Sequence, residues 1–118
     1  MNHKVNNLNT VEVNIPQDFS KYPMGRTDED GPDNGQRFFR EFLLPNIRAG
    51  KHVVVSFDGA RAIGSSFLDE AFGSLIRELN MSTKEALSSV TIVANEPAYA
   101  LYKKMAEQFI REAKPMKV

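Results

Sequence analysis

Two adjacent serines, Ser65 and Ser66, lie after a β-branched run at 52–57 and at the start of an amphipathic helical pattern at 66–79. The first turn of a helix has backbone N–H groups without intrahelical acceptors and carries the positive end of the helix dipole, so it stabilises a phosphate or another anion. Serine is also a preferred N-cap residue, and Asp69 follows Ser66 at capping-box spacing. We therefore expect Ser66 to cap this helix, and the junction is the first candidate site.

A second candidate is the loop at 20–35, which is rich in Gly, Pro, Asp and Asn. Loops this long inside small domains are functional or disordered. Arg26 has a planar guanidinium that suits a bound anion and equally a salt bridge to a neighbouring carboxylate. Asp28, Asp30 and Asp33 loosely resemble a calcium loop, but their spacing departs from the EF-hand pattern. We expect a solvated acidic loop that Arg26 holds in part against the body of the domain.

Hydrophobic periodicity predicts the elements that position these two sites. Strands are expected at 11–15, 52–57 and 89–94, and helices at 36–48, 66–79 and after Asn95, which is the expected cap of the last helix. The apolar run at 53–57 is typical of a parallel strand buried on both faces, so we place it at the centre of the sheet. Pro45 predicts a kink or an early end near Leu44, and His3 to Val5 predict a short edge strand.

The alternation of strands and helices predicts an α/β fold with a mixed, mostly parallel sheet and three helices. The chain has 118 residues, which is the size of one domain. Residues 1–10 form a polar N-terminal segment, and 11–118 form the domain. The cluster of Phe38, Phe39 and Phe42 belongs in the core of this domain.

Composition excludes several classes of function. The 15 basic and 15 acidic residues balance to zero net charge, and the chain has no cysteine. A nucleic-acid binder usually shows a basic excess, a polybasic segment is needed to attract anionic lipid, and thiolate chemistry needs cysteine. The first ten residues are too polar for a signal peptide, and no apolar run is long enough to span a bilayer. We expect a cytoplasmic protein that binds neither nucleic acid nor membrane. The isolated histidines, His3 and His52, offer no catalytic pair.

The block Gly64-Ser65-Ser66-Phe67-Leu68-Asp69-Glu70-Ala71-Phe72-Gly73 follows the strand at Val53 to Phe57. Upstream stand Asp18-Phe19-Ser20, then Pro23, Gly25-Arg26, Gly31, Gly35 and Phe39-Arg40-Glu41. Together, over residues 11 to about 94, these motifs resemble a STAS-like bacterial family of unknown function. That family is similar to STAS domains, the fold of anti-anti-sigma factors and of sulfate-transporter tails. The resemblance therefore implies a single small STAS-like domain.

In anti-anti-sigma factors a strand leads into Asp-Ser-Ser-Gly-Leu at a helix start, and a GHKL-type kinase phosphorylates the second serine. The resemblance places Ser66 at that position, with Ser65 beside it. Gly64 stands in place of the Asp, and Phe67 in place of the Gly, where its bulk would alter the surface that a kinase approaches. The resemblance thus implies a non-enzymatic signalling domain that binds a protein partner, such as a GHKL-type ATPase or kinase. We expect its contact residues to be Arg26, Asp58, Gly64, Ser65, Ser66 and Phe67.

Two other interpretations stay open. In the first, the domain is a small-ligand or nucleotide sensor, and Arg26 grips an anion together with the helix start at Gly64 to Ser66. In the second, which the sequence supports less, the acidic loop serves an uncharacterised enzyme. For the main interpretation we expect no enzymatic activity, no cofactor and no metal. A sensor would gain thermal stability from nucleotides or phosphate, whereas a pure interaction domain would not.

Overall fold

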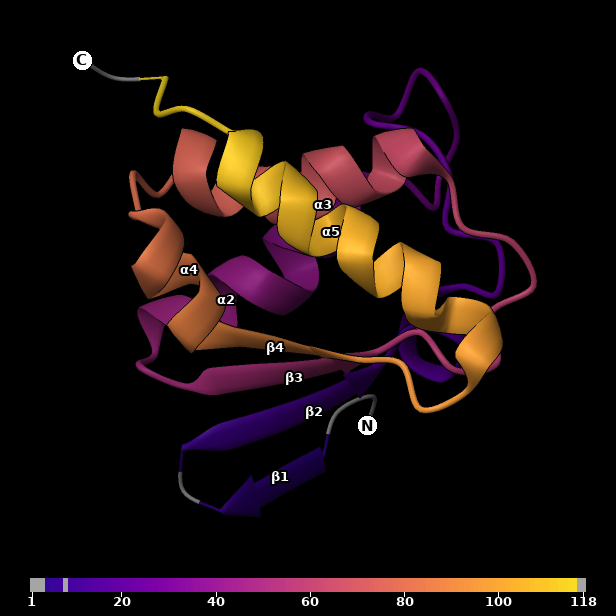
Figure 1. The fold of residues 1–118 in the computed structure, drawn as a ribbon, viewed down its shortest axis with the longest axis horizontal. Coiled ribbons are helices and arrows are strands. Elements are labelled where there is room, and N and C mark those ends of the chain that lie inside the picture. The colour runs from indigo at the N-terminus through magenta and orange to yellow at the C-terminus, as the bar shows by residue number, and fades with distance from the viewer. Residues whose placement is uncertain (1–3, 8, 117–118) are drawn as a thin grey trace.

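The computed structural model describes residues 4–7 and 9–116 of the chain. The strands are β1 (Lys4–Asn7), β2 (Thr10–Asn14), β3 (His52–Ser56) and β4 (Val90–Val93). The α-helices are α1 (Gly35–Phe38), α2 (Leu44–Arg48), α3 (Ser65–Arg77), α4 (Thr83–Ser89) and α5 (Ala100–Glu112). Helical turns of other pitch lie at Ile15–Phe19, Phe39–Leu43 and Pro97–Tyr99. The predicted α/β class is confirmed (Figure 1), but the described residues form five α-helices where the prediction had three.

The described strands form one sheet in the order β1-β2-β3-β4. β2, β3 and β4 run parallel, and β1 pairs antiparallel with β2. Val53 in β3 pairs with Val11 on one side and with Val90 on the other. The predicted central strand and the mixed, mostly parallel sheet are therefore confirmed. The predicted edge strand is present as β1, although His3 itself lies outside the described residues.

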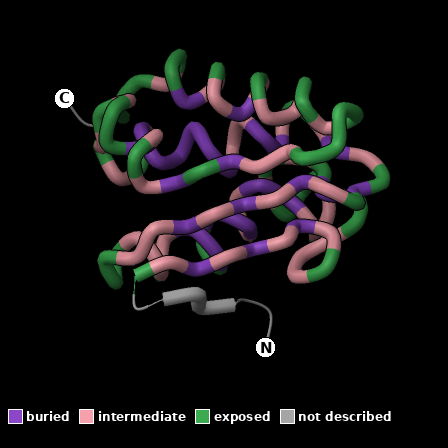
Figure 2. Tube along the Cα trace, turned by 60° about the horizontal axis from the view of Figure 1, so that its bottom comes forward, coloured by how far each residue is buried: buried purple, intermediate pink, exposed green. Residues whose placement is uncertain are grey.

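The labelled helices all lie on one side of the sheet (Figure 1). Along β3, Val53 and Val55 are fully buried, whereas His52, Val54 and Ser56 are half-buried. The same alternation runs along β2, and Figure 2 shows it as repeated changes of burial along the strands. The prediction that β3 is buried on both faces is wrong. A run of three valines looks the same whether the second face is covered by helices or left open.

Phenylalanine rings form the part of the core that lies next to the loop at 20–35. The ring of Phe38 lies 5.2 Å from Phe19, 5.2 Å from Phe42 and 5.7 Å from Phe67, measured between centroids. Phe38 and Phe39 are almost completely buried. The prediction that this phenylalanine cluster belongs to the core is confirmed. Aromatic pairs at such distances add about 0.5–1.5 kcal/mol each to the burial of their area.

Between α1 and α2 the chain stays helical through a wider turn at Phe39–Leu43. In this turn the N–H of Leu44 donates to the carbonyl of Phe39, five residues earlier. Pro45 has no N–H, and in a regular α-helix its ring clashes with the carbonyl four residues before it. The wider turn lies directly before Pro45, where a regular α-helix could not continue. The predicted irregularity near Leu44 is confirmed, but the helix does not end there.

Two helix starts differ from the prediction. The sequence pattern did not predict α4, which begins with a reciprocal capping box. Ser82 Oγ accepts from the Glu85 N–H at 3.1 Å, and Glu85 Oε1 accepts from the Ser82 N–H at 2.9 Å. α5 begins at Ala100 after a tight turn, not from a cap at Asn95. The Asn95 N–H instead donates to the carboxylate of Asp58 at 3.1 Å, which fixes the end of β4 against the end of β3.

Candidate functional site

The loop at 20–35 is fixed by backbone hydrogen bonds along both of its sides. Residues 21–26 bond to 61–64 on one side and to 33–36 on the other. The Gly64 N–H, for example, donates to the Pro23 carbonyl at 3.0 Å. The loop therefore joins the start of α1 to the start of α3, so that its position is set by long-range contacts.

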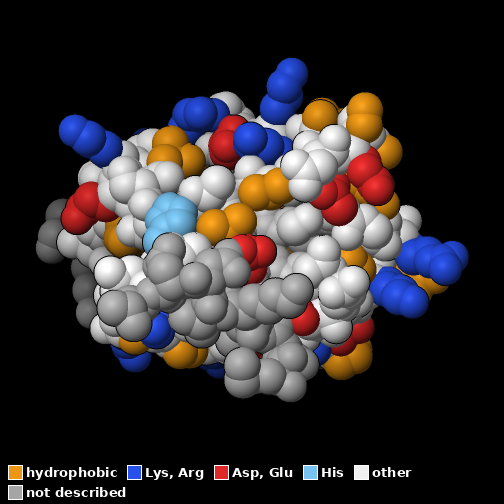
Figure 3. Space-filling model, turned by 90° about the horizontal axis from the view of Figure 1, so that it is seen from below, with side chains coloured by type: hydrophobic (Ala, Val, Ile, Leu, Met, Phe, Trp, Pro, Cys, Tyr) orange, Lys and Arg blue, Asp and Glu red, His pale blue; other side chains and the backbone are white. Residues whose placement is uncertain are grey.

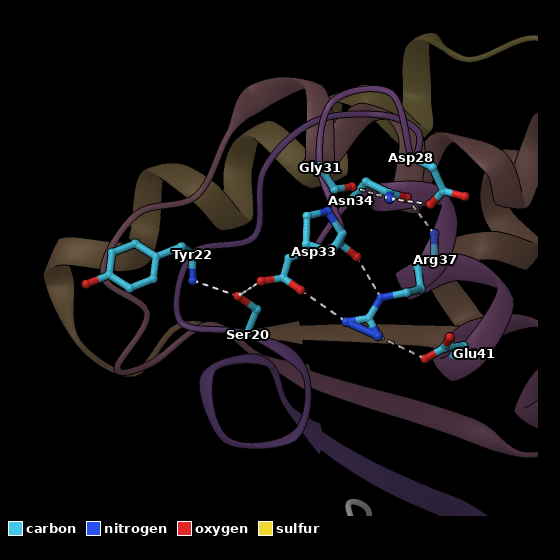
Figure 4. Close-up of polar contacts among 9 residues, drawn as sticks. Ser20, Tyr22, Asp28, Gly31, Asp33, Asn34, Arg37 and Glu41 are labelled. Carbon is cyan, nitrogen blue, oxygen red and sulfur yellow. Dashed lines mark hydrogen bonds and ion pairs between the residues drawn. The ribbon is translucent and has the colours of Figure 1, made fainter.

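The side chain of Asn34 organises the inner turn of this loop (Figure 4). It is completely buried. Its amide nitrogen donates to Asp28 Oδ1 at 3.1 Å and to the Gly31 carbonyl at 2.7 Å. Its amide oxygen accepts from the Arg37 N–H at 2.9 Å and so caps α1. One residue thus closes the loop and starts the helix.

Arg37 and Asp33 close the other side of the loop. Arg37 donates to the Pro32 carbonyl at 2.8 Å and to Asp33 Oδ1 at 3.2 Å. The second carboxylate oxygen of Asp33 accepts from Ser20 Oγ at 2.8 Å. The guanidinium of Arg37 also lies 4.3 Å above the ring of Phe19, within cation–π range. Figure 4 shows this chain of contacts from Ser20 to α1.

The acids that loosely resemble a calcium loop are occupied by separate partners. Asp28 accepts from Asn34, and Asp33 accepts from Ser20 and Arg37. Asp30 Oδ2 accepts from the backbone N–H of Arg26 at 2.8 Å, and this bond is the main cause of the lowered pKa of Asp30. In the part of the chain that the structure describes, no three His, Asp or Glu side chains are grouped to hold a metal ion.

An open hollow of about 500 Å³ lies between this loop and the start of α3. It is lined by Met24, Gly25, Arg26, Asp30, Gly64, Ser65 and Ser66. The structure thus brings together four of the predicted contact residues from two distant segments. Gly64 makes the close approach possible, because a Cβ at this position would lie 2.6 Å from the sulfur of Met24.

Arg26 holds the loop to α3. Its Nη1 lies 2.9 Å from Asp69 Oδ2 and 3.9 Å from Glu70 Oε1, and its side chain is 45% exposed. The predicted contact between Arg26 and the body of the domain is therefore present, as an ion pair with the first turns of α3. Its partner is not evident from the sequence, because Asp69 is 43 positions away and stands at capping-box spacing from Ser66.

The expected cap at Ser66 is wrong. α3 begins at Ser65, and Gly64 is its N-cap, with extended backbone angles and no side-chain cap bond. The Gly64 carbonyl accepts from the Leu68 N–H at 3.2 Å. Because the Gly64 N–H is bonded to the loop, the start of the helix is fixed by tertiary contact and not by a serine hydroxyl. Ser65 is exposed, and Ser66 is half-buried.

Two predicted contact residues do not line the hollow. Phe67 is completely buried against Phe19 and Phe38, so its bulk does not alter the outer surface as expected. Asp58 lies where β3 ends, and its carboxylate accepts from the N–H groups of Asn95 and Glu96 at 3.1 and 3.2 Å. It joins the loops that follow β3 and β4.

Two large apolar side chains are exposed on the loop beside the hollow. Tyr22 is 57% exposed and Met24 is 46% exposed. In Figure 4 Tyr22 points away from the polar contacts that close the loop. Seen from below, on the sheet side away from the helices, the apolar side chains that are visible lie scattered among polar and charged ones (Figure 3). The sequence contains one cue to the exposed apolar side chains of the loop: Tyr22 and Met24 stand in a polar segment without helical or strand periodicity.

Within residues 4–7 and 9–116, none of the helices combines the length and the apolar character needed to cross a bilayer. Comparison with curated proteins and with solved structures gave no match. Over residues 34–100 the chain matches the family described as a STAS-like domain of unknown function (DUF4325). This stretch contains α1, the central strand and the whole of α3. The chain belongs to this STAS-like family.

Proposed function

We propose that this domain is a non-enzymatic regulatory module that binds a protein partner through the surface around the hollow. The observation that carries the proposal is the exposure of Tyr22 and Met24 on a loop whose backbone is bonded on both sides. Aromatic residues, Met and Arg are enriched at protein interfaces. A surface that is already ordered loses little conformational entropy when a partner binds. Tyr22, Met24 and Arg26 supply these residue types on such a surface.

The partner in this proposal is a GHKL-type ATPase or kinase, and Ser66 is the regulated residue, with Ser65 beside it. This part rests on the resemblance to anti-anti-sigma factors. It is supported by the position of both serines in the lining of the hollow. A phosphate there adds a charge of about −2 next to the positive end of α3. Asp30, Asp69 and Glu70 lie close to the same place, so the main effect of the phosphate is to change the surface that the partner meets.

The test is recovery of partners from the native host with purified wild type and matched variants. Tyr22→Ser, Met24→Ser and Ser66→Asp should each reduce recovery of the same partner by at least about tenfold, which corresponds to the loss of a moderate hot spot. Leu101→Ser is the control, because Leu101 is an apolar side chain, 63% exposed, that lies on α5 and belongs neither to the loop at 20–35 nor to the lining of the hollow. Recovery that stays at the wild-type level in all of these variants contradicts the proposal.

The nucleotide or anion sensor remains a second candidate, because one observation favours it. The lining of the hollow includes Arg26 and the start of α3, and these are groups that would hold an anion. The charge around the hollow argues against an anionic ligand. Arg26 is already paired with Asp69, and the carboxylate of Asp30 is part of the lining. A ligand present at 100 times its Kd stabilises a protein by about 2.7 kcal/mol. A clear rise of Tm with nucleotides or inorganic phosphate, lost in Arg26→Gln, would favour the sensor over the interaction module.

A further inference from the structure

Asp69 is shared by two arginines that come from different parts of the chain. Arg26, in the loop, lies 2.9 Å from Oδ2 of Asp69. Arg77, in the last turn of α3, lies 3.2 Å from Oδ1 and also donates to the Asp69 carbonyl at 2.7 Å. Each carboxylate oxygen therefore faces its own arginine, and the two cations do not compete for the same atom.

The contact between Arg77 and Asp69 is unusual in its spacing. Side chains that meet on a helix surface are normally three or four residues apart. Arg77 follows Asp69 by eight residues, which is about 12 Å along the helix axis. Its side chain must therefore lie back along the helix to reach both the carboxylate and the carbonyl of Asp69.

Gly73 provides the space for this path. It lies midway between Asp69 and Arg77, and a Cβ at this position would lie 2.6 Å from both terminal nitrogens of Arg77. Glycine is otherwise a poor residue for the middle of a helix. A methyl group there would displace the guanidinium, which is the flexible end of a long side chain, and would leave the helix backbone in place.

We infer that Arg77 is a positioning residue for the candidate site. It fixes the carboxylate of Asp69, which holds Arg26 and thereby the loop side of the hollow. Without Arg77, the Asp69 side chain loses one of its two anchors, and the loop contact at Arg26 is made less often. The effect on the loop is independent of the proposed function, whereas any effect on partner binding rests on it.

Amide hydrogen exchange of the loop tests this inference, with Met24 and Arg26 as reporters. Their N–H groups donate to the Asp33 carbonyl and to Asp30 Oδ2. In Arg77→Gln and in Gly73→Ala these amides should exchange about threefold faster, the size expected for loss of a partly exposed ion pair. Arg26→Gln removes the ion pair itself, so it should give the largest increase in the exchange rate of these amides. Arg111→Gln on α5 is the control for loss of a positive charge.

Gly73→Ala is the decisive variant because it keeps every charge and improves helix propensity. The exchange of the β3 amides should then stay at the wild-type rate or become slower, while the loop amides exchange faster. Wild-type exchange of the loop in both Gly73→Ala and Arg77→Gln overturns the inference. A uniform acceleration of all amides also overturns it, since that result means a loss of global stability only.

Partner recovery with the same variants keeps the two proposals apart. If the loop amides exchange faster while the amount of recovered partner is unchanged, the positioning role of Arg77 holds and the loop is not part of the proposed interface. Unchanged loop exchange together with loss of recovery in Arg26→Gln supports the interface and overturns the role of Arg77.

Discussion

The side chain of Asn34 offers the sharpest test of how the loop at 20–35 is built. Asn34→Ala removes the cap of α1 and the donors to Asp28 and to the Gly31 carbonyl. Loss of an N-cap costs about 1 kcal/mol. A half-buried carbonyl left without its donor costs about 1 kcal/mol more, whereas the exposed Asp28 can bind water instead. We expect a loss of about 2 kcal/mol in the free energy of unfolding, or a Tm lower by about 8 °C.

Asn34→Asp separates the two roles of this side chain. An oxygen remains to accept from the Arg37 N–H, so the cap is kept. The other oxygen replaces a nitrogen that lies 2.7 Å from the Gly31 carbonyl and 3.1 Å from the Asp28 carboxylate. Repulsion there should make this variant at least as unstable as Asn34→Ala at pH 7. Near pH 4 the protonated carboxyl can donate again, so its deficit relative to wild type at the same pH should shrink.

Urea unfolding at pH 7 and pH 4, followed by far-UV circular dichroism, measures both effects. Asn46→Ala is the matched control, because the Asn46 amide donates to the Phe42 carbonyl and caps no helix. It should lose less than about 1 kcal/mol, the net worth of one ordinary hydrogen bond. Wild-type stability of Asn34→Asp at pH 7 would refute the claim that the amide donors hold the loop.

Three further outcomes are expected. Ser66→Ala should change the free energy of unfolding by less than about 0.5 kcal/mol, because Ser66 is not the cap of α3. Ser82→Ala should lower it by about 1 kcal/mol, because it removes the capping box of α4. Equal losses for the two variants in urea unfolding would contradict this assignment of the caps. The pKa values of Asp30 and Glu85 are lowered, chiefly by hydrogen bonds from backbone N–H groups. The contribution of each carboxylate to stability is therefore complete above the ordinary carboxyl pKa near 4 and is lost as pH falls through the lower pKa of the folded state. The urea unfolding midpoints of Asp30→Asn and wild type should accordingly converge in acid. In hydrogen exchange the amides of Val53 to Val55 should be among the slowest, since β3 is bonded on both sides, and rapid exchange there would contradict the sheet order.

Much of the fold follows from local patterns in the sequence. The apolar run at 53–57, the stripe of α3 and the core phenylalanines are set by burial, which leaves a periodic trace. α4 was missed because Ala86 is its fully buried residue, so its periodic signal is weak. Its capping box, Ser82 to Glu85, was nevertheless present in the sequence and would have identified it.

The candidate site was predicted less completely, because long-range pairs determine it. Arg26 and the two serines could be selected from their types and from the strand-to-helix junction. The partner of Arg26 could not, since 43 positions separate it from Asp69 and no local pattern records their contact. The helix start at Gly64 is likewise decided by the bond from its N–H to Pro23. Propensity favoured Ser66 at this point, and tertiary contact outweighed it.

The position of the α3 cap at Gly64 bears on how Ser65 and Ser66 can function. A serine that caps a helix contributes to stability, so any change of its hydroxyl also weakens the fold. Here Gly64 caps α3, and among the described residues neither Ser65 Oγ nor Ser66 Oγ has a hydrogen-bond partner. We therefore expect that a change at either hydroxyl leaves the core and the hydrogen bonds of the loop in place. In the proposed function, a partner then responds to a change in surface charge and shape, and the stability of the domain is left nearly constant.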